Sequence, residues 1–140
     1  MTYPPQWAQE LMLRALLWWE QESGQPAPAP SLQWRWIPRS ARRFHATGSC
    51  AAIKVTMGTH VPRWRQKSVL LHEIAHAVGD GTHEEHSHCP AFWVRAWRFF
   101  RWARLPLRAV LLGERAYRRG ALAGYRDTRP AAASRSRQRG

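Results

Sequence analysis

The sequence predicts an α+β domain in which a small sheet packs beside several helices. Its 140 residues are close to the usual size of one domain, and 44% hydrophobic with 22% charged residues is a globular balance. Two short segments alternate hydrophobic and polar residues, as half-buried strands do, and four longer segments repeat hydrophobic residues at helical spacing. The resulting order, α-β-β-α-α-α, is typical of the α+β class.

The N-terminal half contains one predicted helix and both predicted strands. The helix covers residues 7–22, and prolines and a glycine make residues 23–31 a linker. Residues 32–36 and residues 50–57 alternate hydrophobic and polar side chains, so each segment predicts a strand. A basic loop is predicted between them, with the arginines Arg39, Arg42 and Arg43.

Three helices are predicted in the C-terminal half. The first covers residues 63–78, and Gly79 stands where a C-terminal cap belongs. After a polar, histidine-rich loop, Pro90 is suited to the first position of a helix that stops at Pro106. The last helix is predicted over residues 107–119.

A single domain is expected over residues 1–125, with its core within residues 32–119. Residues 126–140 carry five arginines, one aspartate and almost no large hydrophobic residue. Such a segment cannot bury enough hydrophobic surface to offset the entropy of ordering the chain, so a disordered basic tail is predicted.

The cysteine count and the hydrophobic pattern exclude several classes of protein. Two cysteines are too few for a disulfide framework or a four-cysteine zinc ribbon, and they suit a reducing compartment. No hydrophobic run approaches the roughly 20 residues of a bilayer span. Glu10 and Arg14 interrupt the first candidate for a signal peptide. A cytoplasmic protein without a membrane span is expected.

The chain is strongly basic, with 22 Lys and Arg against 9 Asp and Glu and a formal net charge of +13. Such a balance attracts polyanions, nucleic acid first and anionic membrane surfaces second. The alternative is that a GC-rich genome raises the arginine content without any partner.

One motif has the spacing of a metal site. The chain reads His72-Glu73-Ile74-Ala75-His76 within a hydrophobic segment of a predicted helix. Side chains at i and i+4 lie on one helix face, so both imidazoles can reach one zinc ion. Glu73 can reach a water on the metal without being a ligand, which completes the parts of a metal-assisted hydrolase. The alternative is a helix whose histidines are solvated or hydrogen-bonded.

Two histidines leave a catalytic zinc site one ligand short, since such sites use three protein ligands and a water. Five of the seven histidines fall within residues 72–88, a composition typical of a metal site. The downstream candidates for the third ligand are His83, Glu84, Glu85, His86, His88 and Glu114.

With this motif the sequence resembles the zincin metallopeptidases. The metzincin branch adds a glycine three residues after the second histidine and a histidine three residues later. Gly79 is in place, but Thr82 stands where that histidine belongs, and His83, the alternative third ligand, is one residue late. A gluzincin-type site would take a glutamate from a later helix, for which Glu114 is the candidate.

The closer resemblance is to the small SprT-like metallopeptidases of bacteria and phages. In these the third ligand stands in a His-Gly-x-x-Phe motif just before a helix. His88-Cys89-Pro90-Ala91-Phe92 resembles that motif, with Cys89 in place of the glycine. The chain lacks the cysteine-rich zinc ribbon of the longer members.

The resemblance implies a compact zincin-like domain in which the sheet packs against an active-site helix. It implies that His72, His76 and His88 hold one Zn²⁺, that Glu73 is the general base, and that the substrate is a protein or peptide. Phe92 is expected to pack into the core and orient His88. Two alternatives stay open: a nucleic-acid-binding protein with a structural or vestigial zinc site, and a zinc hydrolase of a non-peptide amide.

A basic stretch with interleaved aromatic residues follows the motif. Its arginines recur every three or four positions and are Arg95, Arg98, Arg101, Arg104 and Arg108. Arginine neutralises phosphates and aromatic rings stack on unpaired bases, so this arginine stripe predicts contacts with DNA. The alternatives are a membrane surface, or a fold in which the aromatic residues are core and the arginines a solvated face.

Overall fold

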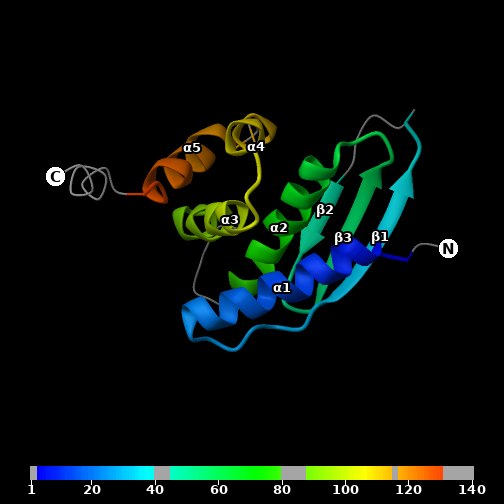
Figure 1. The fold of residues 1–140 in the computed structure, drawn as a ribbon, viewed down its shortest axis with the longest axis horizontal. Helices are drawn as coiled ribbons and strands as arrows, with labels where there is room; N and C mark the ends of the chain where they lie inside the picture. The colour runs from blue at the N-terminus through cyan, green and yellow to red at the C-terminus, as the bar shows by residue number, and fades with distance from the viewer. Residues whose placement is uncertain (1–2, 40–44, 80–87, 115–116, 131–140) are drawn as a thin grey trace.

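The chain folds into one helix, a small sheet and then four further helices, within the residues that the structure describes. The computed structural model describes residues 3–39, 45–79, 88–114 and 117–130. The elements are α1 (Gln6–Ser23), β1 (Ser31–Ile37), β2 (His45–Gly48), β3 (Ala52–Gly58), α2 (Arg63–Gly79), α3 (Pro90–Trp102), α4 (Leu107–Gly113) and α5 (Arg118–Asp127) (Figure 1). The α+β class is confirmed.

The sheet is mixed, with three strands in the order β1-β3-β2. The central strand β3 pairs in parallel with β1 and antiparallel with β2. The register sets Trp34 opposite Val55, and both side chains are buried, so this face of the sheet is hydrophobic. Helices α1 and α2 lie on that side (Figure 1), and the ring of Trp7 in α1 meets that of Trp34 at 5.6 Å.

Strand β2 lies in the segment that the sequence predicted to be a basic loop. Its four residues are too few for an alternating pattern to be visible, and its backbone is held by pairing with β3. Gly48 allows β2 to approach α2 closely, because a Cβ at this position would overlap the carbonyl oxygen of Glu73. The strand therefore depends on contacts with β3 and α2, which the hydrophobic pattern of the sequence cannot predict.

The helices begin close to the predicted residues, but they do not all end where predicted. Helix α1 ends at Gly24, whose φ of 69° is left-handed and whose N–H donates to the carbonyl of Glu20 at 3.0 Å. Helix α3 begins at Pro90, as predicted, but ends before Arg104, which has a φ of 56°.

The last predicted helix, over residues 107–119, is wrong as a single element. It is two helices, α4 and α5, and α5 continues through Arg126 and Asp127, which the composition assigned to the tail. Residues 131–140 of that predicted tail lie outside the described residues.

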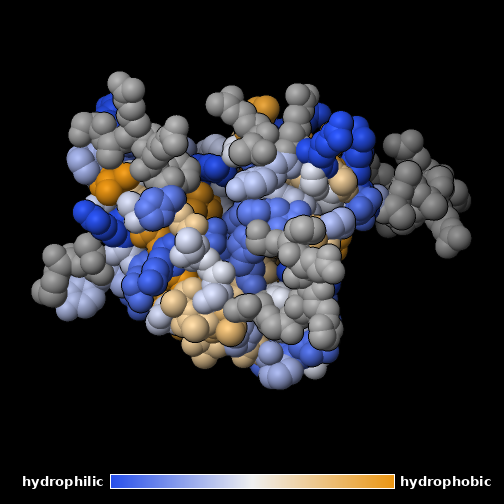
Figure 2. All heavy atoms as spheres, turned by 180° about the vertical axis from the view of Figure 1, so that it is seen from behind, coloured by the Kyte–Doolittle hydropathy of each residue, from blue (hydrophilic) through white to orange (hydrophobic). Residues whose placement is uncertain are grey.

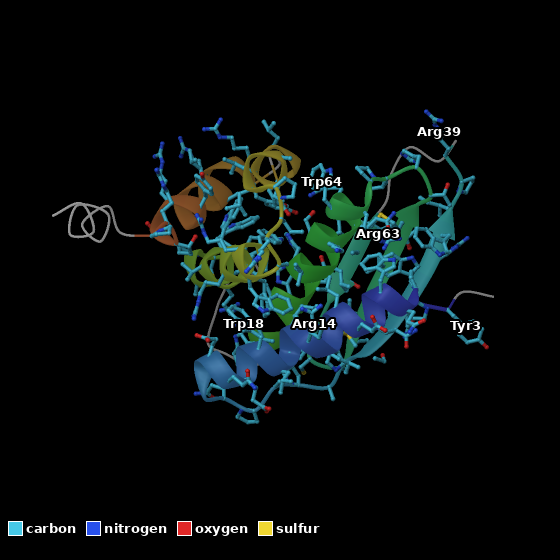
Figure 3. All side chains as sticks on the ribbon, viewed as in Figure 1. Tyr3, Arg14, Trp18, Arg39, Arg63 and Trp64 are labelled. Carbon is cyan, nitrogen blue, oxygen red and sulfur yellow. The ribbon has the colours of Figure 1, made fainter. Side chains whose placement is uncertain are left out.

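Helix α2 lies between the sheet and a group formed by α3, α4 and α5 (Figure 1). The aromatic residues of α3 fill the centre of this group, with Trp93 and Trp97 buried against α5. Trp18 of α1 stacks on Trp102 at the end of α3, with ring centroids 5.5 Å apart (Figure 3). Most of the aromatic residues that interleave with the arginine stripe therefore belong to the hydrophobic core.

One face of the molecule is largely polar where its residues are described. The face in Figure 2 is covered mostly by hydrophilic side chains, between which hydrophobic residues form separate patches. Within the described ranges, no helix has both the length and the hydrophobicity that a bilayer crossing requires.

Gly124→Ala should destabilise the protein, because α5 touches the backbone of α3 at this glycine. A Cβ at Gly124 would lie 2.7 Å from Cβ of Trp93 and 3.0 Å from its carbonyl carbon, so the helices must separate. We expect a loss of about 1–3 kcal/mol in the free energy of unfolding, measured by chemical denaturation. The exposed Ala123→Ser is the control, and an equal effect of both variants would contradict close packing at Gly124.

Candidate metal centre

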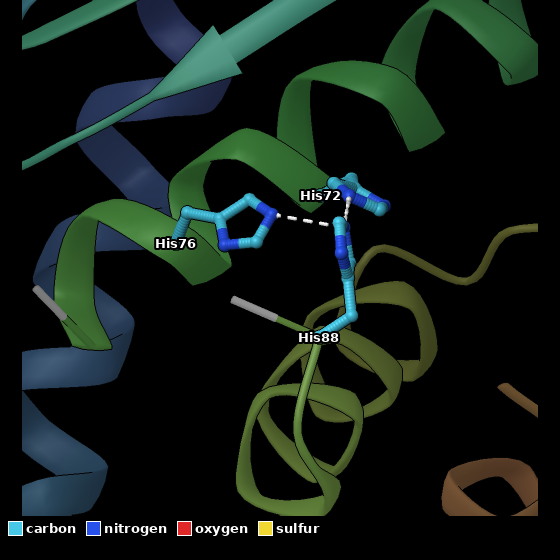
Figure 4. A group of neighbouring side chains, drawn as sticks. All are labelled: His72, His76 and His88. Carbon is cyan, nitrogen blue, oxygen red and sulfur yellow. Dashed lines mark hydrogen bonds between the residues drawn. The ribbon is translucent and has the colours of Figure 1, made fainter. Parts of the chain in front are cut away.

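Three histidines from two elements converge on one point. His72 and His76 lie one turn apart on α2, on the side that faces α3, and His88 projects back from the residue pair before α3 (Figure 4). Nε2 of His88 lies 3.2 Å from Nε2 of His72 and 3.3 Å from Nε2 of His76. In the described part of the chain, these three residues form the whole cluster of candidate metal ligands, with ligand atoms within 4.8 Å of one another.

The spacing of these nitrogens fits a metal ion. Two ligands at 2.0–2.1 Å on a tetrahedral zinc ion are separated by about 3.3 Å, which is close to both measured Nε2 separations. All three donors are imidazoles, and imidazole is a ligand type that zinc and other late transition metals accept. The cluster can therefore hold a metal ion.

Proton positions give a second reason to expect a cation at this point. His72 Nδ1 lies 3.2 Å from Oε1 of Glu114, so His72 donates its proton there and presents a lone pair at Nε2. A single proton on Nε2 of His88 can serve one of its two contacts well, and without that proton the lone pairs of His72 and His88 face each other. A cation among the three nitrogens satisfies every lone pair at once.

Glu114 supports His72 from the side away from the cluster. The carboxylate is buried, with 5% of the residue exposed, and it contacts Nδ1 rather than Nε2. Arg65 lies 3.8 Å from the same oxygen and donates to the carbonyl of Gly113 at 3.0 Å, so it fixes the end of α4 against α2. This carboxylate–histidine pair sets the tautomer and ring orientation that a metal-binding histidine needs.

Aromatic rings hold the three imidazoles in place. Phe92 is fully buried, and its ring centroid lies 4.1 Å from that of His76, on which it stacks, and 5.1 Å from that of His88. The expectation that Phe92 packs into the core beside His88 is confirmed. Tyr117 also stacks on the His88 ring, with ring centroids 4.1 Å apart. Burial lowers the pKa of His88, with His72 adding to the effect and Glu114 opposing it, which favours the neutral ring that binds a metal.

Glu73 lies beside the cluster without joining it. Its Oε1 is 3.9 Å from Nε2 of His72, and it is absent from the group of candidate ligands. Burial raises the pKa of the Glu73 carboxyl to about 7, while His72 lowers it and Glu114 raises it further. The side chain therefore stands where it can exchange a proton with a group bound near His72.

The structure separates the candidates for the third ligand. It brings His88 to the two motif histidines, whereas Glu114 contacts Nδ1 of His72, the ring nitrogen that faces away from the cluster. The alternative ligand His83, together with His86, lies outside the described residues. The supporting role of Glu114 was missed from the sequence, where its one signal was an isolated acidic residue in a basic stretch.

The arginine stripe does not form one open surface. Arg95 donates to the carbonyl of Ala75, and Arg98 lies 3.9 Å from the carboxylate of Glu22. Arg101 donates to the carbonyl of Tyr125. Arg98, Arg104 and Arg108 are exposed. Two of the five arginines, Arg95 and Arg101, are thus hydrogen-bonded to backbone carbonyls of other helices, and DNA binding by the stripe stays a prediction.

No family model matches this chain, and no curated protein or solved structure matches it either.

His88→Ala should lower zinc affinity far more than His83→Ala or His86→Ala. Removal of a ligand should exceed the roughly 10- to 100-fold loss that follows removal of an outer partner. Competition against a chromogenic chelator measures this, and the exposed His60→Ala is the matched control. If His83→Ala alone empties the site, His83 rather than His88 is the third ligand.

Glu114→Ala should weaken metal binding by about 10- to 100-fold while leaving the three ligands intact, because His72 loses the acceptor for its Nδ1 proton. Glu114→Gln should weaken binding less, since the amide oxygen can still accept that proton. The same competition assay distinguishes the variants. Equal affinities for wild type and Glu114→Ala would show that the contact does not support the ligand.

Proposed function

We propose that the chain is a zinc-dependent metallopeptidase in which His72, His76 and His88 hold one Zn²⁺ and Glu73 is the general base. One observation carries this proposal: three imidazole nitrogens converge beside a buried carboxylate that is not a ligand. The sequence resemblance to SprT-like zincins supports it, because the converging residues are the ones that the resemblance implies.

The proposed chemistry assigns each residue a separate task. His72, His76 and His88 would hold the zinc ion, which would supply Lewis acidity at this point. Glu73 takes the proton of the attacking water on its carboxylate and passes it to the leaving amine nitrogen. Glu114 keeps the His72 proton on Nδ1 throughout, and Phe92 excludes solvent from one side of the imidazoles.

A peptide substrate is favoured over a small amide by the position of β2. This strand is an edge of the sheet among the described strands, and Gly48 brings it against α2 at Glu73. An edge strand offers unpaired backbone groups to an extended peptide. The same hydrolytic chemistry on a non-peptide amide would make no use of this edge.

A nucleic-acid-binding protein with a structural zinc site is the alternative function. A structural site is closed by four protein ligands, whereas a catalytic one keeps an open position. The cytoplasmic location also belongs to the proposal, and it is supported by Cys50 and Cys89, neither of which is in a disulfide.

Glu73→Gln should abolish hydrolysis of a casein or peptide substrate, because an amide cannot accept the proton from the attacking water. Zinc content and the unfolding midpoint should stay close to those of wild type, since Glu73 is not a ligand. His76→Ala is the contrasting variant, in which activity and zinc are lost together. Retained peptidase activity in Glu73→Gln would overturn the proposed mechanism, and zinc loss in that variant would make Glu73 a ligand.

A further inference from the structure

A hollow lies beside the sheet, and the strand register places five of its lining residues on the face that points away from the buried Trp34 and Val55. The hollow has a volume of about 510 Å³ and lies between the N-terminal segment and all three strands. We call it the sheet hollow. Its lining residues are Tyr3, Pro4, Leu32, Gln33, Trp34, Arg35, His45, Lys54, Val55 and Thr56.

The strand register gathers basic side chains in the sheet hollow. Arg35 of β1 and His45 of β2 are both partners of Thr56, so they flank the central strand about 10 Å apart, at two strand spacings. Lys54 lies two residues earlier on β3, on the same face. All three are exposed. Among the described residues, no acidic side chain lines the hollow, and none of the three basic residues forms an ion pair.

The surroundings of the sheet hollow add hydrogen-bonding groups, an aromatic ring and more positive charge. Gln33 and Thr56 line it with amide and hydroxyl groups. The ring of Tyr3 is 71% exposed and projects from the N-terminal segment, while Arg39 projects beyond the end of β1 (Figure 3). A ligand with negative charges and flat rings is complementary to this surface.

We propose that the sheet hollow binds a single strand of nucleic acid. Its phosphates contact Arg35, Lys54 and His45, and one base stacks on Tyr3. The volume is in the range of small-molecule sites, which is enough for one or two nucleotides of a strand.

This binding site is independent of the proposed peptidase activity. His72 and His76 point from α2 toward α3 (Figure 4), whereas the outer side chains of the sheet point away from α2. Helix α2 and the sheet thus separate the two sites. Strand binding is expected to persist when the metal is absent, and loss of metal binding does not bear on the sheet hollow.

The test compares two double variants of the full chain that change the net charge equally. Arg35→Glu with Lys54→Glu reverses two charges in the hollow, and Arg104→Glu with Arg108→Glu reverses two exposed charges of the arginine stripe. Binding of a fluorescent 20-nucleotide oligothymidine is followed by anisotropy at several salt concentrations. The hollow variant should bind at least about 10-fold more weakly, with the log–log salt slope smaller by roughly 1.4 for two lost contacts.

Further arms of the experiment separate base stacking from charge and exclude other ligands. Tyr3→Ala should weaken binding by about 5-fold or more at an unchanged salt slope, because stacking is not electrostatic. Arg35→Gln with Lys54→Gln repeats the charge test with smaller changes, and circular dichroism confirms the fold of each variant. Equal weakening by both charge-reversal pairs overturns the proposal, as does absence of binding by wild type at low salt. Binding to anionic vesicles or an acidic peptide in place of the oligonucleotide also overturns it.

Discussion

The contact of α2 with α3 is the constraint on which the candidate metal centre depends. The two motif histidines are fixed by the helix that carries them, but the third imidazole arrives from a different element. Phe92, fully buried, touches the rings of His72, His76 and His88 and therefore sets the distance at which the two helices meet. Further along the contact, Arg95 donates to the carbonyl of Ala75 and fixes the angle of α3 against α2.

The remaining helices maintain this contact. Helix α5 packs on the outer side of α3, where Gly120 and Gly124 leave room for the rings of Trp93 and Trp97. Helix α4 ends at Gly113, and the next residue, Glu114, contacts Nδ1 of His72. A buried carboxylate is costly without partners, and the imidazole and guanidinium groups around it supply them. The far C-terminal helices thus act on the metal centre through packing and through one hydrogen bond.

The two sides of the molecule have different chemistry. The interior between α2 and α3 is aromatic and nearly closed, and within the described residues its polar groups are mostly histidines and glutamates engaged with one another. The outer face of the sheet is exposed and basic. The high positive charge of the chain is thus carried partly by arginines that bind the fold itself, such as Arg101, and partly by exposed residues such as Arg35.

Local patterns in the sequence determined the α+β class, most helix starts and the pairing of His72 with His76, because these depend on spacing along one element. Spacing could not determine β2, the break between α4 and α5, or the contact of Glu114 with His72, since each is set by residues far away in the chain. His88 lies between these cases: a local motif suggested it, and the folded chain brought it to α2. The arginine stripe shows the limit most clearly, because a regular spacing of charges does not say which of them bind other parts of the same fold.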